Sequence, residues 1–127
     1  MSKESVFLLV AAAGLTPIAL AYGLLPATTV PMLYGVEIDS VNIVHIFRAV
    51  MGLYLAMVIF WVMGATREPL RLAALYSVVV FMGGLAMGRL LSLLVDGIPV
   101  APLVIYLVLE VGFALVGLKL AKGLPTG

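Results

Sequence analysis

The sequence contains very little charge and no cysteine. Seven basic and six acidic side chains are spread over 127 residues, so charged residues make up 10% and hydrophobic residues 65%. Soluble domains have about 25% charged residues, and this chain therefore cannot cover a globule with groups that face water. The composition excludes a soluble enzyme and a disordered chain, and the formal net charge of +1 argues against a nucleic-acid partner. The lack of cysteine excludes disulfides and thiolate metal sites.

The sequence contains four long apolar stretches. They cover residues 5–25, 40–65, 70–94 and 102–121, and each is near the ~20 residues that a helix needs to cross a hydrocarbon core. Backbone groups inside lipid must be satisfied within their own segment, and the alternating pattern of a membrane barrel is absent. The sequence therefore predicts an all-α fold, in which one integral membrane domain forms a four-helix bundle.

The links between these stretches differ in length. The second and third stretches meet near Glu68-Pro69, where proline suits the first turn of a helix, and Asp96-Gly97 makes a tight turn before the fourth. Because both links are short, the second, third and fourth helices should be antiparallel neighbours. The longest link, Pro26 to Asp39, has room for a short interfacial helix or for a loop folded over the mouth of the bundle.

The basic side chains near the helix ends all lie on one side of the predicted bundle. This side holds both termini and the second link, and its basic residues are Lys3, Arg67, Arg71, Lys119 and Lys122. The opposite loops carry only Glu37, Asp39 and Asp96. Lysine and arginine concentrate in cytoplasmic loops of membrane proteins. We therefore expect a multi-pass protein of the bacterial inner membrane with both termini in the cytoplasm.

Three charged side chains fall inside the apolar stretches at similar depth. At a rise of ~1.5 Å per residue, Arg48 and Glu110 lie about 12 Å, and Arg89 about 8 Å, from the helix ends opposite the basic side. An ionised residue near the bilayer centre costs about 2.5–3.5 kcal/mol on insertion scales, so such residues are paired or functional. We expect Arg48, Arg89 and Glu110 to form one network, with Asp39 and Asp96 as further ion-pair partners.

This cluster has two interpretations, which are compatible with each other. In the structural interpretation, the ion pairs tie three helices together. In the functional interpretation, the surplus positive charge forms a pocket for an anionic or polar-headed ligand that enters from the periplasm or the outer leaflet. The candidate ligand-binding residues are Asn42, His45, Arg48, Arg89 and Glu110.

The leading functional hypothesis is a small membrane protein that binds an anionic or lipid-like ligand, with membrane lipids as its surroundings. One rival is an accessory subunit of a larger membrane complex. A third hypothesis is a lipid-modifying isomerase-type enzyme that uses His45 and Glu110 for proton transfer. The sequence points to no cofactor, and one histidine without cysteine does not make a zinc or iron site of ordinary composition, although His45 and Glu110 with an aspartate remain an alternative.

Small residues recur along one face of the third stretch. They form Gly84-x-x-x-Gly88, and Ser92 extends the pattern by one turn. Such stripes allow helix backbones to approach closely. We expect the stripe to pack within the bundle in preference to an interface between subunits. We also expect so small and apolar a bundle to form a homo-oligomer.

Two segments carry a resemblance to a known family. They are YGVEIDSVNIVHIFRAVMGLY at 34–54 and GRLLSLLVDGIP at 88–99. Both resemble a bacterial family of four-span integral membrane proteins described as domain of unknown function 4345, and the similarity extends from about Pro26 to Lys119. The resemblance implies a small inner-membrane protein in which these segments form the recognisable core. It implies no activity.

Overall fold

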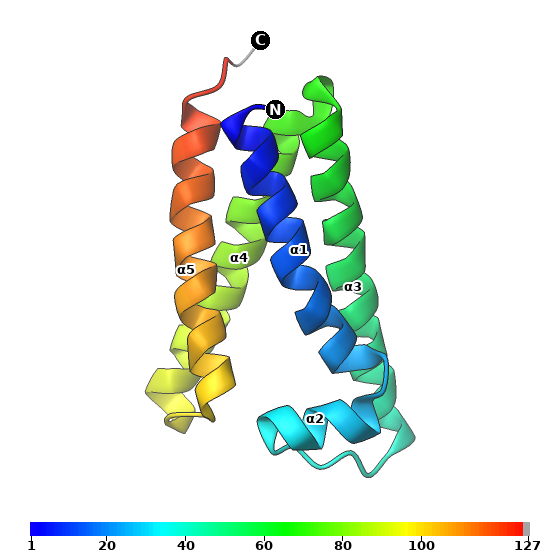
Figure 1. Cartoon of the computed structure of the whole chain (residues 1–127). Coiled ribbons are helices and arrows are strands. Elements are labelled where there is room, and N and C mark those ends of the chain that lie inside the picture. Colours follow the sequence, from blue (N-terminus) through cyan, green and yellow to red (C-terminus); the bar gives the residue numbers. More distant parts are fainter. Residues whose placement is uncertain (126–127) are drawn as a thin grey trace.

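The computed structural model describes residues 1–125, which form five helices and no strand (Figure 1). The helices are α1 (Lys3–Gly23), α2 (Pro26–Tyr34), α3 (Val41–Thr66), α4 (Glu68–Asp96) and α5 (Ala101–Lys122). All except α2 are long and apolar enough to cross a membrane. These four helices begin and end within two residues of the predicted spans, which confirms an all-α, multi-pass membrane protein.

Local sequence explains where the helices begin and end. The hydroxyls of Ser2 and Ser40 accept hydrogen bonds from the backbone N–H groups of Ser5 and Ile43, and thereby cap α1 and α3. Proline stands in the first turn of α2, α4 and α5, where its missing N–H has no helical partner to lose. Gly35 ends α2 in the left-handed conformation at φ 68°, which side chains disfavour.

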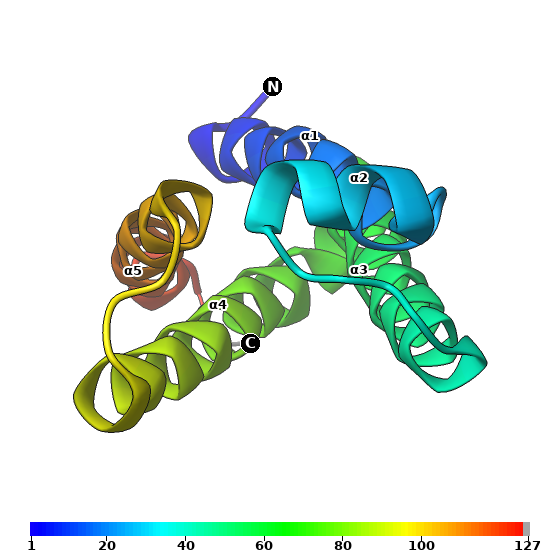
Figure 2. The ribbon, with the colours of Figure 1, turned by 90° about the horizontal axis from the view of Figure 1, so that it is seen from below.

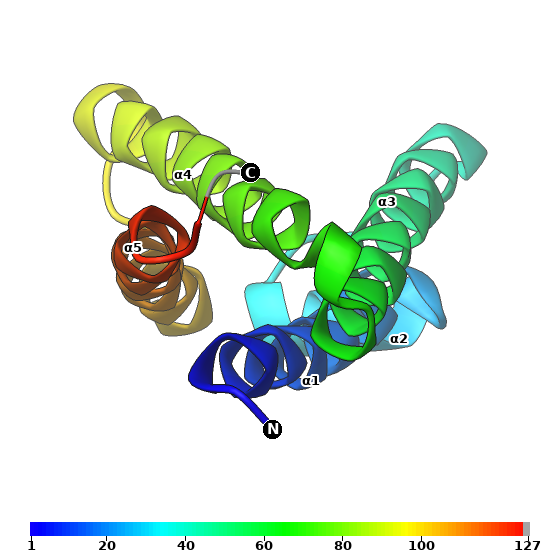
Figure 3. The same ribbon diagram turned by 90° about the horizontal axis from the view of Figure 1, so that it is seen from above.

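The long helices pack as two pairs that diverge. α1 lies along α3 and α4 lies along α5, and the two pairs meet at the end that holds both termini and the α3–α4 link (Figures 1 and 3). We call this the basic end, because Lys3, Arg67, Arg71, Lys119 and Lys122 lie on it. The opposite end, where α3 and α4 point apart, is the open end. α2 lies across α1 at the open end (Figure 2), so the long link holds a short helix.

The tightest core lies toward the basic end. Leu8, Trp61 and Leu75, from α1, α3 and α4, are fully buried there. The Trp61 Nε1 donates a hydrogen bond to the Ser77 hydroxyl at 2.9 Å, which joins α3 to α4. A Cβ placed on Gly64 would meet the side chain of Ala74, so these two helices touch backbone to backbone at that level. This contact fixes the point from which α3 and α4 diverge.

Candidate ligand-binding site

An ion pair joins α4 to α5 in the open half of the bundle. The Nε of Arg89 donates to both carboxylate oxygens of Glu110, at 2.8 Å to Oε1 and 3.1 Å to Oε2. Glu110 is 6% exposed, and among residues 1–125 no other basic and acidic side chains form an ion pair. The sequence predicted this pairing, because two buried charges on neighbouring helices are far less costly together than apart.

Arg48 does not join this ion pair, and the prediction of a three-residue network is wrong in this respect. Its Nη1 donates instead to the backbone carbonyls of Gly23 and Leu24, at 3.1 and 3.5 Å. These carbonyls end α1, where a cation meets the negative end of the helix dipole. A Cβ on Gly23 would clash with Met51 and lie 2.9 Å from the Phe47 carbonyl, so the missing side chain allows α3 to cross at this point. Depth along a helix does not determine which way a side chain faces.

The other predicted polar residues lie apart from the ion pair. Asn42 and His45 are exposed on α3. Asp96 accepts a hydrogen bond from the Ser92 hydroxyl at 2.8 Å, one turn earlier in α4. Neither Asp39 nor Asp96 lies within ion-pair distance of a basic side chain in the part of the chain that the structure describes. The ion pairs expected for these two acids are therefore not formed.

Four tyrosines surround the ion pair, and the sequence analysis did not identify them as a group. The Arg89 guanidinium lies 5.7 Å from the ring centroid of Tyr106, in cation–π range. Tyr22 faces Arg89 from α1, and the rings of Tyr34 and Tyr54 pack on that of Tyr22, with centroids 5.2 and 5.7 Å away. The sequence does contain a signal for this group. Each tyrosine lies within or next to an apolar helix, where a buried hydroxyl needs a hydrogen-bond partner.

The hydroxyls of Tyr34 and Tyr106 form a hydrogen bond of 2.8 Å. This bond ties the end of α2, which lies across α1, to α5 at the open end. Burial raises the pKa of the Tyr34 hydroxyl above its ordinary value, and the hydrogen bond with Tyr106 acts in the same direction. Tyr34 is therefore neutral at physiological pH and keeps its hydrogen bond with Tyr106 there.

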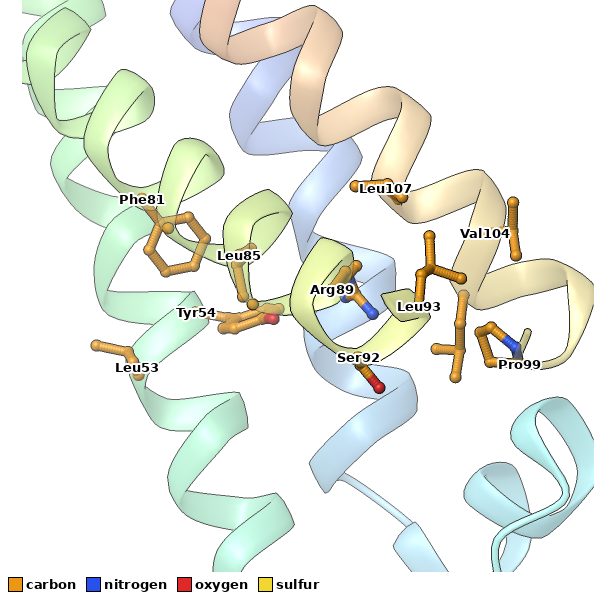
Figure 4. Close-up of a pocket in the computed structure, with 13 residues that line it drawn as sticks. Leu53, Tyr54, Phe81, Leu85, Arg89, Ser92, Leu93, Pro99, Val104 and Leu107 are labelled. Carbon is orange, nitrogen blue, oxygen red and sulfur yellow. The ribbon is translucent and has the colours of Figure 1, made fainter. Parts of the chain in front are cut away.

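A cleft of about 590 Å³ runs along α4 (Figure 4). Its walls are Leu53 and Tyr54 of α3, residues of α4 from Phe81 to Leu93, and Pro99, Leu103, Val104 and Leu107 of the α4–α5 loop and α5. Ligand pockets commonly measure about 300–1,000 Å³ and have mostly apolar walls with a few polar groups. This α4 cleft has that size and that composition.

The glycine stripe of α4 lines the cleft. An added Cβ on Gly84 or Gly88 would meet no atom within 4 Å, and both residues are exposed. The expectation that this stripe packs within the bundle is therefore wrong. Gly64, Gly23 and Gly117 make the close approaches between helices instead. Gly84 and Gly88 widen the α4 cleft, because they place no side chain in it.

Three polar groups reach the α4 cleft. Arg89 uses its Nε for Glu110, and its two Nη atoms have no carboxylate or carbonyl acceptor among residues 1–125. The Tyr54 hydroxyl makes no hydrogen bond with a described residue, and the Ser92 hydroxyl lies one turn beyond Arg89 along the cleft. A guanidinium edge and two hydroxyls in an apolar setting can bind an anionic or strongly polar head group.

A smaller cavity lies on the far side of the ion pair, between α1, α4 and α5. Its volume is about 60 Å³, and its lining includes Glu110, Arg89, Tyr106 and Tyr54. We call it the inner cavity. Arg89 and Tyr54 line both spaces, whereas Glu110 lines only the inner one. The ion pair therefore separates the open α4 cleft from a small polar-edged space.

His45 and Glu110 do not share a cavity. His45 is exposed and lines neither the α4 cleft nor the inner cavity. Within residues 1–125, no three side chains of histidine, aspartate or glutamate come together as a metal site would require. The polar side chains that gather around the two cavities are therefore Arg89, Glu110 and the tyrosines.

Comparison with known proteins shows a family for most of this chain. The family model described as a domain of unknown function, DUF4345, matches residues 4–121. The matched range contains all four membrane-spanning helices, the ion pair and both cavities, apart from the first residue of α1 and the last of α5. Neither the curated proteins nor the solved structures gave a match to this chain.

Proposed function

The chain belongs to the DUF4345 family, and for this member we propose a binding function. The ligand is an anionic, lipid-like molecule, whose head group lies at Arg89 and whose apolar chain lies along the α4 cleft. The observation that carries the proposal is the Arg89 side chain. It is paired with Glu110 through Nε, lines an apolar cleft of about 590 Å³, and has no carboxylate or carbonyl acceptor for its two Nη atoms among residues 1–125.

A purely structural role explains the ion pair less completely. An ion pair that only ties helices together needs bonding partners for the whole guanidinium group, because a polar group without a partner in an apolar setting is costly. The Arg89 side chain is instead 21% exposed, and the cleft beside it is unfilled where Gly84 and Gly88 stand. A guanidinium group beside a hydrophobic wall suits a carboxylate, sulfonate or phosphate attached to a hydrocarbon chain.

The shape of the cleft favours entry from the lipid. Leu53, Gly84, Gly88 and Ser92 all line the cleft and are exposed on the surface of the bundle. A ligand with an alkyl chain can therefore slide in sideways between α3 and α4 without leaving the apolar phase. Its head group then reaches Arg89, which lies two turns from the open end of α4.

A fluorescent alkyl sulfonate tests this proposal. The protein is placed in phosphatidylcholine discs, and a decanesulfonate with a terminal pyrene is added. Trp61 is the single tryptophan, and its ring packs at 5.8 Å on Phe81, which lines the cleft. We expect bound pyrene to quench Trp61, and Arg89→Gln to weaken binding at least tenfold. Arg71→Gln is the control, because Arg71 donates only to backbone carbonyls at the basic end.

A second pair of variants tests the position of the chain. Gly88→Leu fills the cleft and should abolish quenching by the probe, whereas Gly112→Leu adds the same side chain on α5, away from the cleft. Both glycines have open space around them, so both variants are expected to fold. Equal binding by both variants, or by Arg89→Gln and the wild type, would show that the probe does not occupy the α4 cleft.

We also propose that the protein lies in the bacterial inner membrane with the basic end in the cytoplasm. Five basic side chains near the helix ends on one side, and only acidic ones in the loops on the other, support this orientation. The chain has no cysteine, so single cysteines at Glu37 and Glu68 report on opposite ends. On intact cells, an impermeant thiol reagent should label the cysteine at Glu37. Labelling of the cysteine at Glu68 alone would reverse the orientation.

A further inference from the structure

The polar layer around Arg89 has no surplus positive charge to balance a bound anion. Because Arg48 is bonded to the end of α1, the polar layer in the open half consists of one cation and one anion, Arg89 and Glu110. The pair is neutral as it stands. An anionic head group at the Arg89 Nη atoms would bring the layer to a net charge of −1 beside a buried carboxylate, and uncompensated charge at low dielectric is costly.

One proton on Glu110 removes this cost. We propose that the binding of an anion at Arg89 is coupled to the uptake of one proton by Glu110, so that ligand and proton enter the site together. The inference rests on the proposed function and specifies how that site is regulated. In the bound state, one Glu110 oxygen gains an O–H bond, while Arg89 faces two acceptors, the head group and the other Glu110 oxygen.

The geometry of the ion pair allows this change without moving a helix. Both Glu110 oxygens accept from the same Arg89 Nε, at 2.8 and 3.1 Å, so one can be protonated while the other keeps its hydrogen bond. The inner cavity touches Glu110 on the side away from the ligand. Its volume of about 60 Å³ is that of roughly two water molecules, which can pass a proton from the aqueous phase to Glu110.

The other groups around Glu110 do not supply the proton themselves. Arg89 faces it from α4, Tyr22 from α1 and Tyr54 from α3, and Tyr106 lies on α5 itself. α2 contributes Tyr34, which is bonded to Tyr106. Arginine and tyrosine ordinarily titrate near pH 10 or above. Below about pH 9, Glu110 is therefore the group whose charge can change within this cluster.

The test uses the same pyrene-labelled decanesulfonate, because a sulfonate does not titrate in the range studied. Binding to the wild-type protein in phosphatidylcholine discs is measured between pH 4 and pH 9, with empty discs as the blank. We expect a pH interval in which the affinity rises tenfold for each unit of decrease in pH. Calorimetry in two buffers of different ionisation enthalpy should then show one proton taken up per probe bound. Binding without a pH slope and without proton uptake would overturn the coupling.

Variants assign the proton to its residue. Glu110→Gln keeps the size and one acceptor oxygen but carries no charge, so it should bind the sulfonate with equal affinity at all these pH values. His45→Gln removes the one histidine and should keep the slope of the wild type. A slope that persists in Glu110→Gln, or that disappears in His45→Gln, would overturn the assignment. The calorimetric result on the wild type stands even if Glu110→Gln does not fold.

Failure of the coupling and failure of the proposed function give different results. If the wild-type protein binds the probe and Arg89→Gln does not, the binding site is supported whatever the pH profile shows. If Arg89→Gln binds as tightly as the wild type, or if the wild type does not bind at all, both the site and the coupling are refuted.

Discussion

Gly64 near the basic end and Gly84 toward the open end contribute to the bundle in opposite ways. At Gly64, α3 and α4 lie so close that a Cβ would meet Ala74, whereas a Cβ on Gly84 would meet nothing within 4 Å. Both are glycines within long apolar helices. The comparison shows that a small residue permits close packing without causing it, and that the same residue can enlarge a cavity where the neighbouring helix has diverged.

Two half-buried arginines, Arg71 near the basic end and Arg89 toward the open end, also differ in what they bond. Arg71 donates to the carbonyls of Gly64 and Ala65, which end α3, and so serves the packing of the basic end. Arg89 bonds a carboxylate through Nε, and its side chain lines the α4 cleft. Arg71 therefore serves packing at the basic end, whereas Arg89 lines a cleft in the open half.

The largest effect is expected from Glu110→Ala. This change leaves the half-buried Arg89 without its carboxylate, and breaking a buried ion pair costs about 3–5 kcal/mol. Unfolding in mixed micelles, followed by circular dichroism, measures the loss. Arg89→Ala combined with Glu110→Ala should cost less than the sum of the two single changes. Glu37→Ala, at an exposed position in the α2–α3 link, should stay within about 0.5 kcal/mol of the wild type.

The two glycine environments predict opposite signs for the same substitution. Gly64→Ala forces α3 and α4 apart and should destabilise the protein by about 1–3 kcal/mol. Gly84→Ala adds a methyl group in open space and should stabilise α4 by up to about 1 kcal/mol through helix propensity. The same unfolding assay compares the two variants. A loss of similar size in both would show that the cleft is closed in the membrane.

A smaller effect is expected from Trp61→Phe at the basic end. The indole N–H then no longer donates to Ser77, although the Ser77 hydroxyl keeps its own bond to the Ala74 carbonyl at 2.6 Å. The cost should be about 1 kcal/mol for the lost hydrogen bond, with a further contribution from the smaller ring. Tyr76→Phe, on an exposed face of α4, serves as the control and should leave the unfolding midpoint unchanged.

Tyr34→Phe should have the smallest and most local effect. It removes the bond to Tyr106 that ties α2 to α5, worth about 0.5–1.5 kcal/mol. We expect faster amide exchange in α2 and unchanged exchange in α3 near Trp61. Tyr106→Phe breaks the same bond and should loosen α2 equally. Unchanged exchange in α2 with either variant would mean that this bond does not hold the open end.

The sequence predicted much of the fold because the signals concerned are local. A run of about 20 apolar residues in lipid has to be helical, so the four spans could be located to within two residues. The pairing of Arg89 with Glu110 followed from their depth and the cost of unpaired charge. For the link after Pro26, the sequence allowed either a short helix or a loop. Only the structure shows that this link forms the helix α2.

The candidate site was predicted only in part, because depth was the single coordinate available. Arg48 lies at the depth expected but faces the end of α1, where it bonds Gly23. Asn42 and His45 share its helix and likewise lie outside the α4 cleft. The tyrosines around Arg89 come from four helices, and no spacing along one helix brings them together.

By itself, the sequence determined the number of spans, the ends of the four long helices and the presence of charged side chains at one depth inside them. Hydropathy, capping and the cost of burying charge act over a few neighbouring residues, and the chain displays them directly. Only the tertiary structure decided that α3 and α4 diverge, that Gly84 and Gly88 line a cleft, and that Arg89 rather than Arg48 faces it. Those features depend on the rotation and tilt of each helix. Contacts between helices, such as Gly64 with Ala74 and Gly23 with Met51, set this rotation and tilt.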